Sequence, residues 1–84
     1  MIEHFSCVWA GLGDSQRAAR LLGTADCQRE RTGIPRGEQD QIHLDQFLGP
    51  ARSTLSDEAW VGAYTEGRQL TMDEALAEGL SRLP

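Results

Sequence analysis

Cys7 and His4 are the residues of this chain whose types and spacing come nearest to a nucleophilic site. They lie three positions apart, so on a helix the imidazole and the thiol could touch, and a neighbouring histidine is a base that can activate a cysteine. Such a site also needs a group that orients the base, and no third residue stands out. The pair gives one hypothesis, a thiol enzyme or thiol-based redox sensor. Because no complete set of nucleophile, base and orienting group can be named, the sequence favours a protein without enzymatic activity and without a catalytic residue.

The two cysteines and two histidines could also form a metal site or a disulfide. No Cys-x-x-Cys or His-x-x-x-His spacing is present, so no metal is expected at His4, Cys7, Cys27 or His43. If the first two helices turn back near Gly13, the cysteines are offset by about 12 Å along the helix axes. A disulfide spans at most roughly 7 Å between Cα atoms. We expect two free thiols, both facing away from the apolar stripes of their helices.

The basic residues are all arginines, and the net charge is −5. Without lysine a Walker A loop is excluded, and the negative charge disfavours nucleic acid or an anionic membrane as a partner. Arg17, Arg20 and Arg31 share one side of a predicted helix, with Arg29 and Arg36 nearby. They are either a contact surface for an acidic partner or a phosphate backbone or, as the net charge favours, a solvated face paired with carboxylates.

Targeting signals and cofactor motifs are absent from the sequence. No apolar run approaches the roughly 20 residues of a membrane span. The segment that starts the chain lacks the basic region of a secretion signal. Because free thiols are typical of reducing compartments, we expect a cytoplasmic protein. Because no cofactor motif is present, we expect no cofactor.

The stretch 14–35 predicts a long central helix around which the others are organised. Asp14 is placed as its N-cap, and Gly33, Ile34 and Pro35 are placed to end it. Its apolar stripe follows the spacing i, i+3, i+4, i+7 and consists of Ala18, Leu21, Leu22 and Ala25.

A first helix precedes it and ends at Gly11 and Gly13. So short a connection predicts that the two helices pack antiparallel, as a helical hairpin. The stripe of the first helix consists of Ile2, Phe5, Val8, Trp9 and Leu12. Met1 leads directly into this amphipathic sequence, as it would in a fragment of a longer array, although a short natural protein could begin in the same way. In a fragment, the stripe would have lost a partner. An unpaired stripe could seek a second copy of the chain.

A third helix is predicted from Glu38, with a kink or break at Gly49-Pro50 because proline removes a backbone donor. Its apolar residues are Leu44, Phe47, Leu48, Ala51 and Leu55. A fourth helix is predicted to begin after the cap Ser56 and to stop at Gly67. Its expected buried residues are Trp60, Val61 and Tyr64.

The clearest start signal is a capping box at Thr71 and Glu74, in which each residue's side chain bonds the other's backbone amide. It opens a fifth helix whose stripe is Met72, Ala75, Leu76, Leu80 and Leu83. The predicted fold is therefore a single all-α domain of about five helices over residues 1–84. In it a leading antiparallel hairpin is capped at its open end by the last three helices.

In three of its segments the chain resembles the C-terminal end of large bacterial ATPase-type transcriptional regulators of the LuxR/AfsR kind. The segments that carry it are GDSQRAARLLGTADCQRERTG, ARSTLSDEAW and YTEGRQLTMDEALAEGL. The matching positions are Gly13, Arg17 to Gly23, Arg52, Leu55, Trp60, Glu66, Gly67, Arg68 and Thr71 to Ala75. Pro50 departs from the pattern, which has small helix formers there. The family's ATP-binding and DNA-contact residues lie outside the matching part.

The resemblance implies a tetratricopeptide-like terminal repeat that closes the regulator's helical sensor arm. The expected function is a non-enzymatic protein-interaction module in transcription regulation, whose partner is another protein or the remainder of the parent regulator. The alternative is a free-standing homodimer that associates through the first helix. The expected interaction surface consists of Ile2, Phe5, Trp9, Arg17, Arg20 and Arg31.

Overall fold

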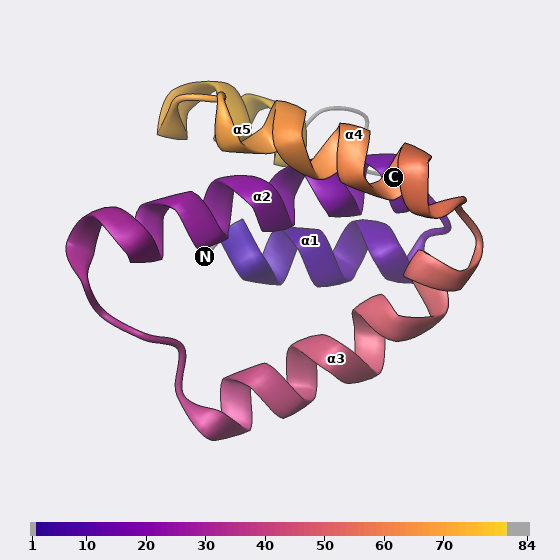
Figure 1. The fold of residues 1–84 in the computed structure, drawn as a ribbon, viewed down its shortest axis with the longest axis horizontal. Helices are drawn as coiled ribbons and strands as arrows, with labels where there is room; N and C mark the ends of the chain where they lie inside the picture. The colour runs from indigo at the N-terminus through magenta and orange to yellow at the C-terminus, as the bar shows by residue number, and fades with distance from the viewer. Residues whose placement is uncertain (1, 81–84) are drawn as a thin grey trace.

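Helix α2 lies at the centre of the fold, with other helices on several of its sides (Figure 1). The computed structural model describes residues 2–80, which contain five helices and no strand. The helices are α1 (Ile2–Gly11), α2 (Ser15–Thr32), α3 (Glu38–Ser53), α4 (Asp57–Arg68) and α5 (Met72–Leu80). The predicted all-α class with about five helices is confirmed.

Both ends of α2 have the predicted caps. The Asp14 carboxylate accepts a hydrogen bond of 3.1 Å from the backbone N–H of Arg17. At the other end Gly33 has a φ of 72° and donates to the carbonyl of Arg29 at 2.9 Å. A positive φ of this kind is readily available only to glycine, so the helix ends there.

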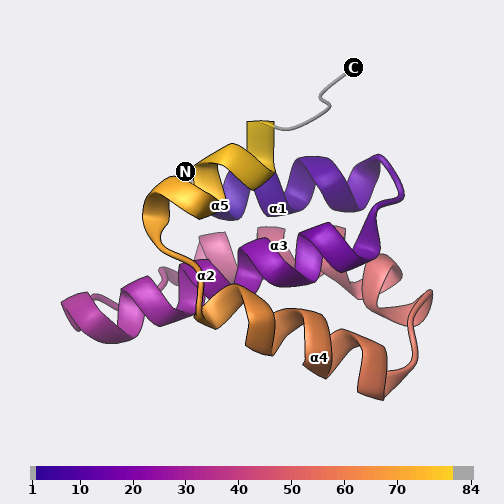
Figure 2. The same cartoon turned by 90° about the horizontal axis from the view of Figure 1, so that it is seen from above.

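Helices α1 and α2 form the predicted antiparallel hairpin (Figure 2). The chain reverses at Gly13, whose φ is 90°. Ser6 ties the two helices together, because its buried hydroxyl donates to the carbonyl of Ala18 at 2.8 Å. Trp9 is buried in the hairpin, whereas Leu12 at the end of the stripe is exposed.

Helices α2 and α4 approach so closely that their backbones touch at two glycines. A Cβ atom added at Gly23 would lie 2.1 Å from the carbonyl oxygen of Tyr64, and one added at Gly67 would lie 1.8 Å from that of Arg20. The Thr24 hydroxyl donates to the Gly67 carbonyl at 2.6 Å across the same contact. The prediction that Gly67 stops the fourth helix is wrong, because α4 continues to Arg68 and Gly67 is part of its buried face.

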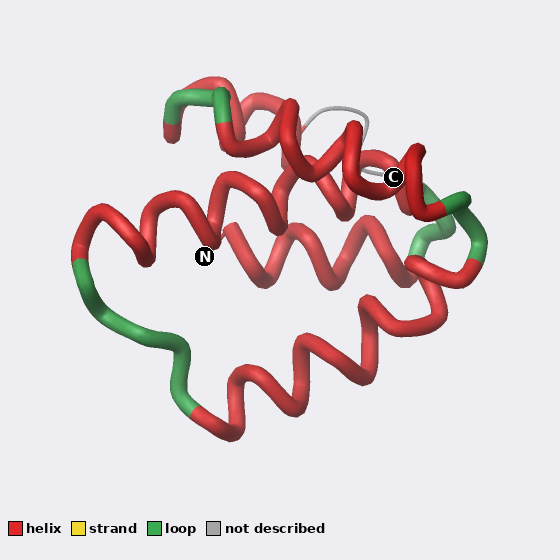
Figure 3. The backbone as a smooth tube through the Cα atoms, viewed as in Figure 1, coloured by secondary structure: helices red, strands yellow, loops and turns green. Residues whose placement is uncertain are grey.

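The last three helices do not gather at the open end of the hairpin, so that part of the prediction is corrected. Helix α4 packs along α2, α5 contacts both α1 and α2, and α3 contacts chiefly α1. The loop over residues 33–37 carries the chain away from α2 before α3 begins (Figure 3). The core thus surrounds α2 rather than filling one end of a hairpin.

Helix α3 is continuous through Pro50, so the predicted break is wrong. Gly49 precedes the proline and has no Cβ to collide with its ring. The carbonyl that Pro50 leaves without a donor belongs to the exposed Gln46, where water can replace the missing bond. Leu44, Leu48 and Ala51 are buried, whereas Phe47 is exposed.

The start signals of α4 and α5 are confirmed. The Ser56 hydroxyl accepts from the N–H of Ala59 at 3.1 Å. In the capping box the Thr71 N–H donates to Glu74 at 2.9 Å, and the Glu74 N–H donates to the Thr71 hydroxyl at 3.1 Å. The predicted buried faces need correction: Val61 is 55% exposed. On α5 the buried residues are Ala75 and Gly79, whereas Met72 and Leu80 are exposed. Leu83 lies outside the described residues.

Candidate functional site

A cleft of about 250 Å³ between α1 and α3 brings the thiol and both histidines together. Its lining residues are Glu3, His4, Cys7, Arg29, Asp40, His43 and Leu44. The sequence spacing paired Cys7 with His4, and the fold adds His43 from the facing helix. Within residues 2–80 no three His, Cys, Asp or Glu side chains lie close enough together to hold a metal ion.

Cys7 is a buried thiol with little nucleophilic character. It is 7% exposed, so the prediction that it faces away from the packed side of its helix is wrong. Helix α1 is contacted by α2, α3 and α5, so more than one of its faces is covered. Burial raises the pKa of the Cys7 thiol, and the carboxylate of Glu3 raises it further. A thiol with a raised pKa is protonated at neutral pH and attacks slowly. Cys27 is a free thiol and partly buried.

Slow alkylation of Cys7 is the expected result of this environment. In a Cys27→Ser variant, which leaves Cys7 as the single thiol, we expect labelling by iodoacetamide at neutral pH to be at least about tenfold slower than for free cysteine. The same variant unfolded in denaturant supplies the rate of an accessible thiol. A Cys7 that labels faster than free cysteine would restore the hypothesis of a thiol enzyme or redox sensor.

Most arginines near α2 are paired with carboxylates from other parts of the chain. Arg20 donates to Glu78 on α5 at 2.9 Å, and Arg17 lies 3.4 Å from the same carboxylate. Arg29 donates to Glu3 on α1 at 2.6 Å. These pairs are the solvated, salt-bridged face that the net charge favoured.

Arg36, in the loop before α3, connects three helices through one guanidinium. It donates to Glu3 on α1 at 2.9 Å, to Asp26 on α2 at 2.6 Å and to Gln41 on α3 at 3.1 Å. Burial raises the pKa of the Glu3 carboxyl, but the hydrogen bonds and charges of Arg29 and Arg36 outweigh it, so the net pKa is lowered.

Acid sensitivity should follow from Glu3. Because its folded pKa is below 4.5, the stabilisation is complete above that pH and is lost as the pH falls through the lowered value. We expect Glu3→Gln to lower the free energy of unfolding by about 1 kcal/mol at neutral pH, and by progressively less as the pH falls through the lowered pKa of Glu3. Urea unfolding of both proteins across this range measures the difference. A gap between the two proteins that stays constant with pH would contradict the assignment.

The six residues predicted as an interaction surface are distributed between core and surface. Trp9 is 6% exposed, so it is a core residue rather than part of a surface; its indole N–H donates to the carbonyl of Gly79 at 2.9 Å. Phe5 packs against Gly79, and the Arg17 guanidinium lies 4.2 Å from the centre of the Trp9 ring. Arg20 is paired as described above, and Arg31 is exposed. The side chain of Ile2 lies outside the description.

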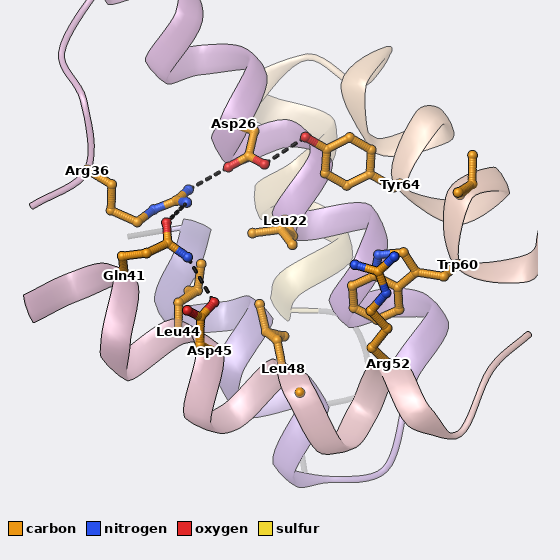
Figure 4. Close-up of a pocket in the computed structure, with 12 residues that line it drawn as sticks. Leu22, Asp26, Arg36, Gln41, Leu44, Asp45, Leu48, Arg52, Trp60 and Tyr64 are labelled. Atoms are coloured by element: carbon orange, nitrogen blue, oxygen red, sulfur yellow. Dashed lines mark hydrogen bonds and ion pairs between the residues drawn. The ribbon is translucent and has the colours of Figure 1, made fainter. Parts of the chain in front are cut away.

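A groove of about 630 Å³ lies between α2, α3 and α4 (Figure 4). Apolar side chains from all three helices line it: Leu22, Leu44, Leu48, Trp60 and Val61. Trp60 stands at one end beside Arg52, whose guanidinium lies 5.7 Å from the centre of its ring. The volume is within the range of ligand-binding clefts. Its floor is apolar: Leu44, Leu48 and Trp60 are buried beneath it, Leu22 is partly buried and Val61 is exposed.

Polar groups stand at the other end of the groove, where Figure 4 shows Asp26 between Arg36 and Tyr64. The Tyr64 hydroxyl donates to Asp26 at 2.6 Å, and the amide of Gln41 donates to Asp45 at 2.9 Å. Burial raises the pKa of Tyr64, and its bond to Asp26 raises it further, so Tyr64 stays a neutral donor.

A second hollow of about 530 Å³ adjoins this polar end and makes the site elongated. The two hollows share Asp26, Arg36, Gln41 and Tyr64. Ile34 and Pro35 of the loop line the outer part, which gives the exposed Ile34 side chain a place in the site. The sequence did not indicate this groove, because its walls come from helices that are distant in the chain. The one available signal was that α3 and α4 carry more apolar residues than a single buried stripe needs.

The chain matches no family model, and searches of the curated proteins and of the solved structures find no significant match. None of the helices within residues 2–80 combines the length and the hydropathy that crossing a membrane requires.

Proposed function

We propose that this chain is a non-enzymatic protein-interaction module that binds a partner in the groove between α2, α3 and α4. The observation that carries the proposal is the elongated, apolar-floored groove, with Leu22, Leu44 and Leu48 along it and Trp60 at one end. Concave, mostly apolar hollows between packed helices are a common form of binding site. The buried, protonated Cys7 makes the thiol alternative less favourable.

The biological setting we propose is the closing part of the helical arm of a cytoplasmic bacterial transcriptional regulator. The resemblance motif contains both Gly23 and Gly67, and these two residues are the ones that allow α2 and α4 to touch. A pattern shared for packing reasons would retain such glycines. An in-frame nucleotide-binding domain encoded upstream of Met1 is expected, and an unrelated or interrupted frame there would contradict this setting.

Selection from a random peptide library tests the groove without assuming a ligand. Peptides selected on the unmodified chain should lose binding to Val61→Trp, which places a bulky ring over the groove floor. The matched control is Gly62→Trp on the same helix. Gly62 does not line the groove, and a side chain added there would project into open space. Circular dichroism checks that both variants fold. If the selected peptides bind all three proteins equally, or if none is selected, the proposed function fails.

A further inference from the structure

We infer that the occupant of this groove is an amphipathic helix with basic residues flanking its apolar stripe, an inference that rests on the proposed function. The reason is the distribution of charge around the groove. Arginines and carboxylates are both present among the lining residues, but they differ in how far they are already neutralised within the fold.

The lining arginine Arg36 is fully engaged inside the molecule. It contacts the two carboxylates of Glu3 and Asp26, so it offers little positive charge to a partner. Arg68, on the Tyr64 side of α4, is paired with Glu30. Of the lining arginines this leaves Arg52, whose guanidinium lies over Trp60 and forms no ion pair with any residue between 2 and 80.

The carboxylates on the rim have no such partners. Asp45 lines the groove and receives only the neutral amide of Gln41. Glu38 lies seven positions before Asp45, and Asp57 four positions before Val61, so each extends the groove-facing side of its helix. Among residues 2–80, eight carboxylates form no ion pair with an arginine, and all of them are on α3, α4 or α5. They are Glu38, Asp40, Asp45, Asp57, Glu58, Glu66, Asp73 and Glu74.

The shape of the groove favours an α-helix as the partner that carries the complementary positive charge. The groove is walled by two helices over a floor of leucines and continues into the hollow beside Ile34. An amphipathic helix inserts apolar residues at i, i+3, i+4 and i+7 into such a floor, and its flanking residues then lie against the rim. A second copy of this chain is disfavoured as the occupant, because it carries a net charge of −5 and would be repelled.

Three synthetic peptides of about 15 residues test the inference. The first carries leucines at helical spacing flanked by lysines, the second has the same leucines flanked by glutamates, and the third has the composition of the first with its leucines out of register. Binding to the full chain is measured by fluorescence anisotropy of labelled peptides. We expect the lysine peptide to bind at least about tenfold more tightly than the glutamate peptide, and the scrambled peptide to bind no more than weakly.

Variants of the chain locate the effect. An Asp45→Asn, Asp57→Asn double variant should reduce the preference for lysine several-fold, and Val61→Trp should remove binding that Gly62→Trp retains. Equal affinity for the lysine and glutamate peptides would overturn the basic occupant and leave the proposed function standing. Equal binding of the scrambled peptide, or binding unchanged by Val61→Trp, would overturn docking of a helix in the groove. Self-association of the chain that Val61→Trp abolishes would identify a second copy as the occupant instead.

Discussion

Replacing Gly67 by alanine is expected to lower the free energy of unfolding by about 3 kcal/mol or more. The added methyl group would lie 1.8 Å from the carbonyl oxygen of Arg20 and 2.5 Å from the carbonyl carbon. Both are backbone atoms in the middle of α2, so they cannot rotate away as a side chain would. The helices must separate, and the bond from Thr24 to the Gly67 carbonyl is then stretched or lost. Urea unfolding followed by circular dichroism measures the change.

Gly62 is the matched control for this prediction. It lies on the same helix, and a Cβ added there meets no atom within 4 Å. Alanine has the better helix propensity, so Gly62→Ala should raise the free energy of unfolding by about 0.5 to 1 kcal/mol. The same substitution on one helix is therefore expected to act in opposite directions at two positions. If Gly67→Ala is as stable as Gly62→Ala, α2 and α4 do not touch at this residue.

Trp9→Ala is expected to have the second large effect, a loss of about 3 to 5 kcal/mol in the free energy of unfolding. The indole is buried between α1, α2 and α5, where it contacts the Arg17 guanidinium and donates to the Gly79 carbonyl. Alanine would leave a cavity there and an unsatisfied carbonyl on α5. Because the Trp9 side chain is one of the links between α1 and α5, the amide hydrogens of α5 should lose protection first in a hydrogen-exchange experiment.

Trp9→Phe refines this prediction and separates it from the homodimer alternative. Phenylalanine keeps much of the buried ring but cannot donate to Gly79, so we expect a smaller loss of stability. Sedimentation velocity at several concentrations is the accompanying measurement. A Trp9→Ala variant that keeps its full stability but changes its state of association would place Trp9 at an interface between copies rather than in the core.

The parts of the fold that sequence reasoning predicted correctly depend on residues close together in the chain. A cap such as Asp14 or the Thr71–Glu74 box bonds backbone groups within one turn, so the required residues are adjacent in the sequence. The left-handed end at Gly33 is local in the same way. Together with the Ser56 cap of α4, these signals located four helix ends before any packing was known.

The errors concern which face of a helix meets a neighbour. Val61 has the right spacing to join Trp60 and Tyr64, yet it is exposed, because α4 turns the side that contains Trp60, Ala63 and Gly67 toward α2. Gly67 looked like a stop signal because its role depends on the position of Arg20, which is 47 residues away in the sequence. The groove was missed for a related reason, since it results from the path of α3 away from α2.

The hydrogen bonds of Arg36 help to fix the path of α3 away from α2. Helix α3 is held against α1 and α2 by its buried Leu44 and Leu48, and its beginning is held in addition by Arg36, whose side chain joins Glu3, Asp26 and Gln41. Because this additional attachment is ionic, acid and salt should loosen the beginning of α3 before they affect the leucine and tryptophan packing around α2.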